Sequence, residues 1–544
     1  MHQQDIAFLP GYRITRLDFG DVVQSGGCII GLRGIERGDG DERRQHAANG
    51  LRVDPGRIPG DYATGLQSPH PGLHRRHRQT RNGSQMGQRR ATVGDQLTGQ
   101  HTIDIVERRR RPGSVRICHR RTVSDERTGA MSKRVETWQL RAQFAAGLSQ
   151  MYGAEVPAYH TLVEVTAEVN RAFVGAHSEA QRLGTLERVT AERHGAIRVG
   201  NTAELAQVAD LFSAFGMYPV GYYDLREAAS PVPVVSTAFR PVERDTLERN
   251  PFRVFTSMLA TADRRFFSAD LGDRVQRFLA QRRLFDPALI TRAQQIATAG
   301  GCSPEVADEF VAAAVSAFAL SSEPIDRTWY QELAAVSAVA ADIAGVTTTH
   351  INHLTPRVLD IDELHRAMTA RGITMIDDIQ GPPRTNGPQV LLRQTSFRAL
   401  AEPRRFRATD GSVTKGTLRV RFGEVEQRGV ALTPLGRQRF DAAMSEPDPA
   451  AVWEQHFPAT DEQMAAAGLA YYCGGDPAKP VVYEDFLPAS AAGIFRSNLE
   501  SDTAASDRRA DGSDDSDYSQ QWMAGQIGHH IHDPYELYEK VACS

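Results

Sequence analysis

Three short segments that lie far apart in the chain carry the residues that most constrain its fold. They cover residues 192–198, 350–357 and 422–428 and contain His194, His353 and Glu424. His194 and His353 are 159 positions apart, and Glu424 follows after a further 71, so only a folded domain can bring them together, unlike the ligands of a zinc finger. Two imidazoles and one carboxylate on one side of a metal leave its other side open, as Fe(II) oxygenases require. The three residues are candidate ligands of a ferrous ion.

The third segment belongs to an alternating pattern that predicts one strand over residues 417–430. On such a strand one face would carry Leu418, Val420, Phe422, Glu424 and Glu426. A buried carboxylate is unfavourable unless a metal, an arginine or water meets it. The alternative is that this face reaches the edge of a sheet and that both glutamates are solvated. Glu424 is nearer the apolar residues and is the better ligand, whereas Glu426 is expected to support the site from behind.

The second segment contains two histidines, His350 and His353, three positions apart. On a strand they would point to opposite faces, so only one could reach an interior metal. Ile351, His353 and Thr355 would share one face, which favours His353 as the ligand and places His350 at the surface or behind the site. On a helical turn the two histidines would instead lie together.

The first segment pairs His194 with Arg198, four positions later. The two share a face of a strand, about 13 Å apart along it, or one turn of a helix. An arginine presents a planar fork that grips a carboxylate through two hydrogen bonds, which suggests an anionic substrate. The alternative is that Arg198 pairs with a local acid such as Glu192.

The first 130 residues differ in composition from the rest of the chain. They contain 22 Arg, no Lys and 14 Asp or Glu, whereas residues 131–544 contain 41 Lys or Arg and 53 Asp or Glu. They show almost no apolar periodicity, so they cannot bury enough surface to offset chain entropy. We interpret residues 1–130 as a disordered or non-native extension, with Met131 as the natural start. A basic arm for nucleic acid is the disfavoured alternative.

The cysteines and the hydropathy indicate a soluble, cytoplasmic protein. The five cysteines, at positions 28, 118, 302, 473 and 543, form no Cys-x-x-Cys pair, which argues against a disulfide framework and a structural zinc site. The sequence contains no run of 18 apolar residues, so we expect no membrane-spanning segment. Neither a membrane nor a nucleic acid is expected as a partner.

From Met131 onward the pattern predicts an α+β fold with helices around a mixed sheet. Residues 134–187 predict two helices, and a helix beginning near Thr202 separates predicted strands. The expected strands cover residues 196–199, 218–223, 232–239, 389–395 and 417–430, together with the segment from His350. An Ala-rich helical insertion is expected at about 257–345, a mobile acidic loop at about 501–519 and a closing helix at 534–541.

A second histidine group near the C-terminus competes as a metal site by composition. It consists of His529, His530 and His532. Because it follows the predicted mobile loop, a solvated tail is the favoured interpretation.

Longer blocks of the sequence resemble a known family. They cover residues 192–200, 216–225, 236–240, 250–257, 350–357, 391–397, 422–429 and 483–488. Over about residues 135–500 and the closing helix, the chain resembles the 2-oxoadipate dioxygenase/decarboxylase, or hydroxyglutarate synthase, family of the vicinal oxygen chelate superfamily. Residues 1–130 have no counterpart in that family.

The resemblance implies a fold, a reaction and a set of site residues. The fold is a vicinal-oxygen-chelate-like mixed β-sheet or half-barrel with a large helical insertion and surrounding helices. The reaction converts 2-oxoadipate and O2 to 2-hydroxyglutarate and CO2 in lysine degradation. The implied residues are His194, His353 and Glu424 as Fe(II) ligands, Arg198 as the anchor of the substrate carboxylate, and Ala489, which is Val in relatives, lining the substrate.

Two other classes of function remain open at this point. A glyoxalase-like isomerase or a ring-cleaving dioxygenase of the same fold would keep the metal but would not need Arg198 at a distal carboxylate. A non-catalytic ligand-binding member would not need the three metal ligands.

Overall fold

The computed structural model describes residues 7–8, 12–13, 134–177, 192–228, 231–419, 421–487 and 517–543. The chain divides into two compact units, residues 1–117 and 118–544. In the first, β1 (Ala7–Phe8) pairs antiparallel with β2 (Tyr12–Arg13). The rest of the predicted N-terminal extension, the predicted loop as far as residue 516, and Ala489 lie outside the described residues.

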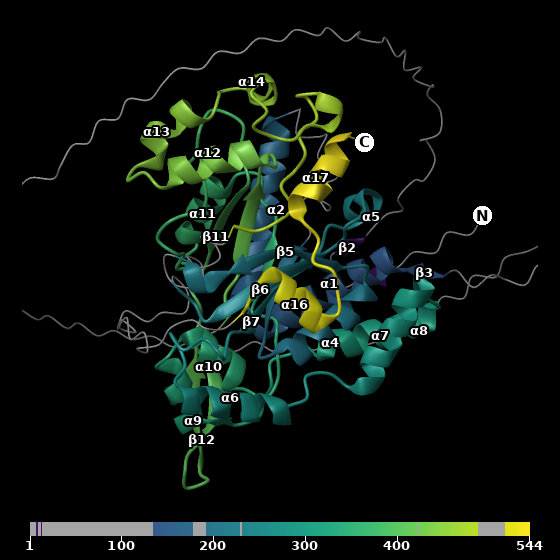
Figure 1. The fold of residues 1–544 in the computed structure, drawn as a ribbon, viewed down its shortest axis with the longest axis vertical. Helices are drawn as coiled ribbons and strands as arrows, with labels where there is room; N and C mark the ends of the chain where they lie inside the picture. The colour runs from purple at the N-terminus through teal and green to yellow at the C-terminus, as the bar shows by residue number, and fades with distance from the viewer. Residues whose placement is uncertain are drawn as a thin grey trace, which may run out of the picture. The chain divides into compact units, whose positions relative to one another are not determined.

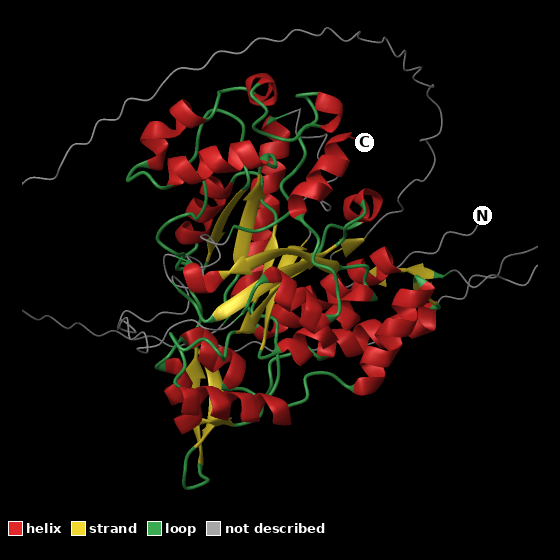
Figure 2. Ribbon diagram, in the orientation of Figure 1, coloured by secondary structure: helices red, strands yellow, loops and turns green. Residues whose placement is uncertain are grey.

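A five-stranded mixed sheet forms the centre of the second unit (Figures 1 and 2). Its order is β10 (His353–Pro356), β4 (Glu192–Val199), β7 (Arg253–Leu259), β6 (Val234–Arg240) and β5 (Tyr218–Asp224). The pair β4 and β7 is parallel and the other pairs are antiparallel. The predicted α+β class with a mixed sheet is confirmed.

The central strands are buried on both faces. Along β4, Ile197 and Val199 belong to one hydrophobic cluster, whereas Ala196 belongs to another. Because side chains alternate along a strand, His194 and Arg198 share the face of Ala196. Both are nearly inaccessible, with 1% and 4% of their surface exposed, so the sheet places an imidazole and a guanidinium inside the protein.

Helices from the first and from the last part of the second unit cover the sheet. The two helices predicted before β4 are α1 (Thr137–Glu155) and α2 (Ala158–Ala176), and the helix predicted at Thr202 is α4 (Thr202–Ser213). The other α-helices of the described residues outside the insertion are α5 (Arg244–Arg249), α11 (Ile361–Ala370), α12 (Pro434–Met444), α13 (Pro449–His456), α14 (Asp461–Ala466), α16 (Gln520–Ile527) and α17 (Pro534–Cys543). The predicted closing helix is therefore present as α17.

The stretch in which the sequence predicts a helical insertion carries five helices. They are α6 (Ala269–Gln281), α7 (Pro287–Ala299), α8 (Pro304–Ser316), α9 (Arg327–Ala334) and α10 (Ala338–Ala344). Two short strands, β8 (Gly301–Cys302) and β9 (Ile325–Asp326), lie between them, and β8 pairs with β3 (Val135–Glu136). The predicted start at residue 257 is too early, because residues 257–259 complete β7 in its ladders with β4 and β6.

The single strand predicted over residues 417–430 is wrong. The chain forms β13 (Val413–Leu418), paired with β12 (Glu402–Arg407), and then a separate strand, β14 (Glu424–Arg428), paired with β11 (Leu392–Ser396). Gly423 lies in the break, where a Cβ atom would come within 2.2 Å of the Phe397 ring. A larger residue here would require the Phe397 ring or the backbone to shift. Glu424 and Glu426 nevertheless share a face of β14.

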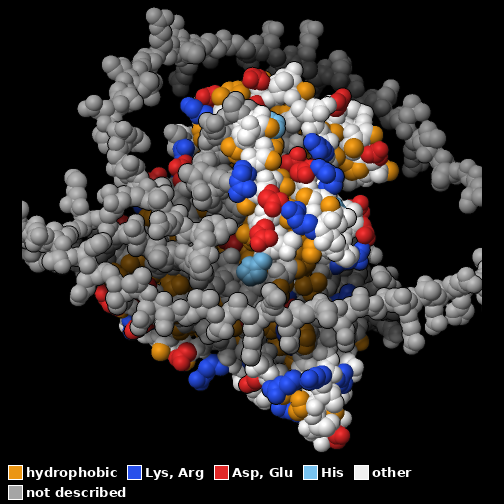
Figure 3. Space-filling view, turned by 180° about the vertical axis from the view of Figure 1, so that it is seen from behind, with side chains coloured by type: hydrophobic (Ala, Val, Ile, Leu, Met, Phe, Trp, Pro, Cys, Tyr) orange, Lys and Arg blue, Asp and Glu red, His pale blue; other side chains and the backbone are white. Residues whose placement is uncertain are grey.

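The surface carries both signs of charge. Figure 3 shows acidic and basic side chains interspersed over the described residues on one face. Among the described helices, none combines the length and the apolar character needed to cross a lipid bilayer.

Candidate metal centre

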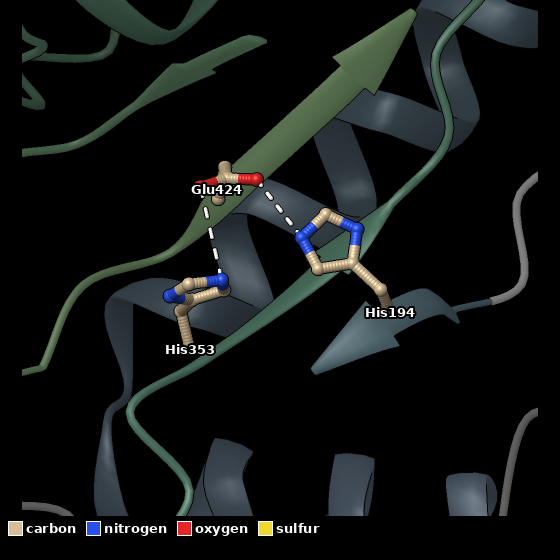
Figure 4. Close-up of side chains that lie close together, drawn as sticks. All are labelled: His194, His353 and Glu424. Carbon is tan, nitrogen blue, oxygen red and sulfur yellow. Dashed lines mark ion pairs between the residues drawn. The ribbon is translucent and has the colours of Figure 1, made fainter. Parts of the chain in front are cut away.

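Three predicted ligands from three strands meet in the interior. The Nε2 atom of His194 lies 3.0 Å from Oε1 of Glu424, and Nε2 of His353 lies 3.7 Å from Oε2 of the same carboxylate (Figure 4). The potential ligand atoms of the three residues all lie within 4.8 Å of one another. Within the described residues this is the one group of three such side chains that can hold a metal ion.

The spacing of these atoms suits a facial arrangement around one ion. Metal to nitrogen and metal to oxygen bonds are about 2.1 Å long, so adjacent ligands at right angles lie about 3 Å apart. The Glu424 carboxylate lies 3.0 and 3.7 Å from the two imidazole Nε2 atoms, and no pair of the three ligand atoms is more than 4.8 Å apart. Two imidazoles and one carboxylate in this arrangement leave the opposite positions free for a substrate and dioxygen.

Strand register brings the two histidines together. In the antiparallel pair of β10 and β4, His353 lies opposite Ala196 and Thr355 lies opposite His194. Residues opposite each other share a face, so His353 and His194 are diagonal neighbours on one face of the sheet. Their rings are 5.5 Å apart and nearly perpendicular. The third strand, β14, contacts β10 and supplies Glu424.

Glu426 orients His194. Its Oε2 atom lies 2.8 Å from Nδ1 of His194, and both groups are buried. Burial alone would raise the pKa of Glu426, but Arg428 and His194 lower it well below its usual value. An ionised carboxylate can only accept a hydrogen bond, so Nδ1 carries the proton and Nε2 faces Glu424. The predicted supporting role of Glu426 agrees with this geometry.

Replacing Glu426 by glutamine should weaken metal binding by about 10–100-fold, because the outer partner of a ligating histidine fixes its tautomer and raises its basicity. Titration of the metal-free variant with Fe(II) under anaerobic conditions measures this change. Glu402→Gln is a matched control, since Glu402 is also buried and is paired with Arg421. Equal affinities for the Glu426→Gln variant and the unmodified protein would contradict the orienting role.

The two imidazoles have different electrostatic environments. Burial lowers the pKa of His353 to about 3, so that its ring is neutral and able to bind a metal. Burial would also lower the pKa of His194, but Glu426 and Glu424 outweigh it and raise this pKa. The site thus favours positive charge between its two carboxylates. A divalent ion that replaced the Nε2 proton of His194 would meet the same need.

Two further residues hold Glu424, and sequence reasoning did not single them out. The side-chain amide of Gln394, on β11, donates to Oε1 of Glu424, and the Thr355 hydroxyl lies 3.5 Å from the same atom. Gln394 lies opposite Glu426 in the β11–β14 ladder. The only sequence signal for Gln394 was its position in one of the blocks that carry the family resemblance.

Arg198 lies on the same strand face as His194, as predicted, but it is paired with a distant acid. Its Nη1 atom donates to Oδ2 of Asp342 on α10. Asp342 is 144 residues away in sequence, so the predicted alternative of a local partner such as Glu192 is wrong. Glu192 instead accepts from the hydroxyls of Ser149 and Tyr159, 2.7 and 2.5 Å away.

His350 is not among the three converging residues. It precedes β10, with Nε2 3.3 Å from Oδ1 of Asp342 and 3.1 Å from Nδ2 of Asn352. Only 3% of its surface is exposed, which excludes the predicted surface position and leaves the supporting one. Burial would raise the pKa of Asp342, but His350 and Arg198 lower it well below its usual value.

A segment at residues 483–487, called the strap below, covers His194. The Phe486 ring lies 4.9 Å from the His194 ring and 4.9 Å from that of Phe255. Buried partners hold the strap carboxylates: Arg193 and Arg253 bind Glu484, and Arg240 and the Tyr538 hydroxyl bind Asp485. The strap therefore places an aromatic ring beside His194.

The competing histidine group does not form a comparable site. His529 and His532 are partly exposed and His530 is exposed. The His529 Nε2 atom lies 3.6 Å from Asp210, and the rings of His530 and His532 are 4.8 Å apart. These residues contribute to no group of three metal-binding side chains in the described part of the chain.

Comparison with known proteins identifies relatives over most of the second unit. A family model described as 2-oxoadipate dioxygenase/decarboxylase matches residues 144–498. The protein of that name from Mycobacterium tuberculosis (strain ATCC 25618 / H37Rv) is 71% identical over 411 residues, which cover 76% of this chain and 98% of the relative. The protein of that name from Escherichia coli (strain K12) is 38% identical over 452 residues, with the same coverage.

A solved structure shows the same fold. The crystal structure of the hydroxyglutarate synthase from Pseudomonas putida in complex with 2-oxoadipate superposes with a TM-score of 0.63 at 36% identity, covering 75% of this chain and 96% of that one. The family match, the identity and the shared fold agree with the resemblance seen in the sequence. The chain belongs to the 2-oxoadipate dioxygenase/decarboxylase family.

Proposed function

We propose that this chain is an Fe(II)-dependent dioxygenase/decarboxylase that converts 2-oxoadipate and O2 to 2-hydroxyglutarate and CO2. The observation that carries the proposal is the buried group of His194, His353 and Glu424 in a member of this family. The reaction is balanced, since six carbons and seven oxygens of diacid and O2 reappear in the five-carbon hydroxy diacid and CO2. The 2-oxo acid supplies the electrons itself, so no second organic reductant is needed.

We assign the metal to Nε2 of both histidines and to the Glu424 carboxylate. These three residues would hold ferrous iron, which would supply a chelation site for the 1-carboxylate and 2-oxo oxygens of the substrate and the redox chemistry with O2. Neutral imidazoles are the ligating form, and the low pKa of His353 supports that assignment. Glu426 keeps the His194 proton on Nδ1, which directs Nε2 to the ion.

The surrounding residues orient the substrate and exclude water. Arg198 is assigned to the distal carboxylate, because it lies on the same strand face as His194 and its charge acts on His353. Its planar guanidinium can bind both oxygens of one carboxylate, and it also donates to Asp342. Phe486 and Phe422 provide aromatic walls beside His194 and His353, so reactive species are kept from water.

The anaerobic binding of 2-oxo acids tests this function most directly. The Fe(II) protein is mixed with 2-oxoadipate without O2, and a visible charge-transfer band is expected when the 2-oxo acid chelates the metal. Admission of O2 should discharge the band and yield 2-hydroxyglutarate and CO2 in equal amounts. A 2-hydroxy acid without the oxo group is the control. Absence of both band and product with 2-oxoadipate would overturn the proposal.

We propose that residues 131–544 contain the whole catalytic unit, since the family match begins at residue 144 and relatives align with 76% of the chain. A protein that begins at Met131 should keep the kcat, the KM and the melting temperature of the full chain. A protein that begins at Pro157 is the control, because it lacks α1 with its buried Tyr152, whose hydroxyl lies 2.7 Å from the Phe422 carbonyl. A clear loss of activity or stability on removal of residues 1–130 alone would contradict this proposal.

A further inference from the structure

The guanidinium of Arg198 is positioned from outside its own strand. Its Nη1 atom donates to Asp342, which lies on α10. Both side chains are buried, with 4% and 3% of the residue surface exposed. A buried arginine and carboxylate in direct contact hold each other firmly, because separating them would strand a charge in a low-dielectric interior.

Asp342 is in turn fixed by the segment that leads into β10. Its Oδ2 atom accepts from Nδ2 of Asn352 at 2.9 Å, and its Oδ1 atom faces Nε2 of His350 at 3.3 Å. That segment is anchored to β4, because the backbone N–H of Asn352 donates to the Ala196 carbonyl at 2.8 Å. The Thr349 hydroxyl likewise donates to the Arg198 carbonyl at 2.8 Å. These hydrogen bonds therefore fix the position of Asp342 relative to β4, the strand that carries His194.

Open space lies beside Asp342 and His350. A cavity of about 160 Å³ is lined by Asp342 and His350, together with residues of α9 and of the β12–β13 hairpin. Asp342 therefore borders a cavity, and its carboxylate is held by hydrogen bonds and ion pairs to Arg198, Asn352 and His350. The buried ion pair with Asp342 restrains the Arg198 guanidinium.

We propose that Asp342 is a specificity-determining positioning residue that sets the chain length of the substrate. The proposal rests on the function proposed above, in which one end of the substrate binds the metal and the other binds Arg198. The metal end is fixed by β4, β10 and β14, and the far end is fixed by Asp342 through Arg198. The distance between these two points selects among 2-oxo diacids that differ by one methylene.

A homologous series of diacids isolates this effect. Removing the charge of Asp342 changes the attraction of Arg198 for every dianion, but it does so for all members of the series alike. The preference for six carbons over five or seven depends instead on where the guanidinium lies. Enzymes typically discriminate between substrates that differ by one methylene by about 10–200-fold. A loss of positioning would therefore be measurable as a smaller preference for 2-oxoadipate over its homologues.

The test compares Asp342→Asn with the unmodified holoenzyme. Values of kcat/KM are measured for 2-oxoglutarate, 2-oxoadipate and 2-oxopimelate, and dissociation constants are measured by calorimetry on the anaerobic Fe(II) protein. We expect the preference for 2-oxoadipate over its two homologues to fall about 10-fold in both measurements, the lower end of the usual discrimination for one methylene. His350→Ala removes one support of Asp342 and should shift the same ratio in the same direction by a smaller factor.

Asp263→Asn is the matched control, because Asp263 is also fully buried and is paired with Arg226 and Arg265. It should change stability without changing the chain-length ratio. If Asp342→Asn does not fold, the ratio measured for His350→Ala decides. An unchanged ratio in the folded Asp342→Asn variant, or in His350→Ala in its place, overturns the proposal.

Failure of this proposal is distinguishable from failure of the proposed function. If the unmodified protein neither binds nor turns over 2-oxo acids, the function itself is wrong. If Arg198→Ala lowers kcat/KM for diacids and for monoacids by the same factor, Arg198 is not the anchor and Asp342 cannot act through it. If Arg198 discriminates between them but Asp342→Asn leaves the chain-length ratio intact, only the role of Asp342 is overturned.

Discussion

Replacing any one of His194, His353 and Glu424 by alanine should abolish O2 uptake with 2-oxoadipate and sharply lower the iron content. The three side chains offer three ligand atoms within 4.8 Å of one another, so each variant leaves only two protein ligands. An ion with two protein ligands loses both affinity and the fixed open face on which the substrate and O2 must meet. An oxygen electrode and metal analysis of the purified variants measure the two effects.

The same experiment separates ligands from their neighbours. His350→Ala should keep its iron, because His350 contacts Asp342 and Asn352 rather than the three ligands. His530→Ala should leave both iron content and activity unchanged, because His530 is exposed and belongs to the C-terminal histidine group. Loss of iron in His350→Ala together with its retention in His353→Ala would show that the wrong histidine has been assigned.

Much of the candidate site was predictable because strand patterns constrain it. The alternation around residues 196–199 predicted a strand, and β4 places His194 and Arg198 on one face. Parity also favoured His353 over His350, and His353 is the one that joins the other two ligands. His353 and Thr355 alternate as that argument expects, although β10 begins only at His353; the role of His353 as a ligand stays a prediction.

The features that sequence could not predict depend on long-range contacts. Asp342 is one acid in an Ala-rich helix, and its partner lies 144 residues earlier, so no local spacing marks it. The break between β13 and β14 includes Gly423, which lies close to Phe397, a contact that only the folded chain establishes. The strap was visible as a block of family resemblance, but its contact with His194 through Phe486 was not.

The buried ion pair changes how an Arg198 variant must be designed. Arg198→Ala removes the partner of Asp342 and leaves a buried carboxylate, which typically costs about 3–5 kcal/mol of stability. The double variant Arg198→Ala with Asp342→Asn removes the stranded charge and is the control for this loss. Comparing the two by thermal unfolding separates the damage to the fold from the loss of substrate contact.

Arg198→Ala should reduce kcat/KM for 2-oxoadipate far more than for 2-oxohexanoate, a monoacid of the same chain length. A charge-assisted contact with the distal carboxylate contributes roughly 1.5–3 kcal/mol, which corresponds to about 10-fold to 150-fold in specificity. Arg198→Lys keeps the charge but loses the planar fork, so it should be only partly active. The ratio of kcat/KM for the two substrates, measured by O2 consumption, is insensitive to a general loss of folded enzyme. A purely structural Arg198 would depress the turnover of both substrates equally.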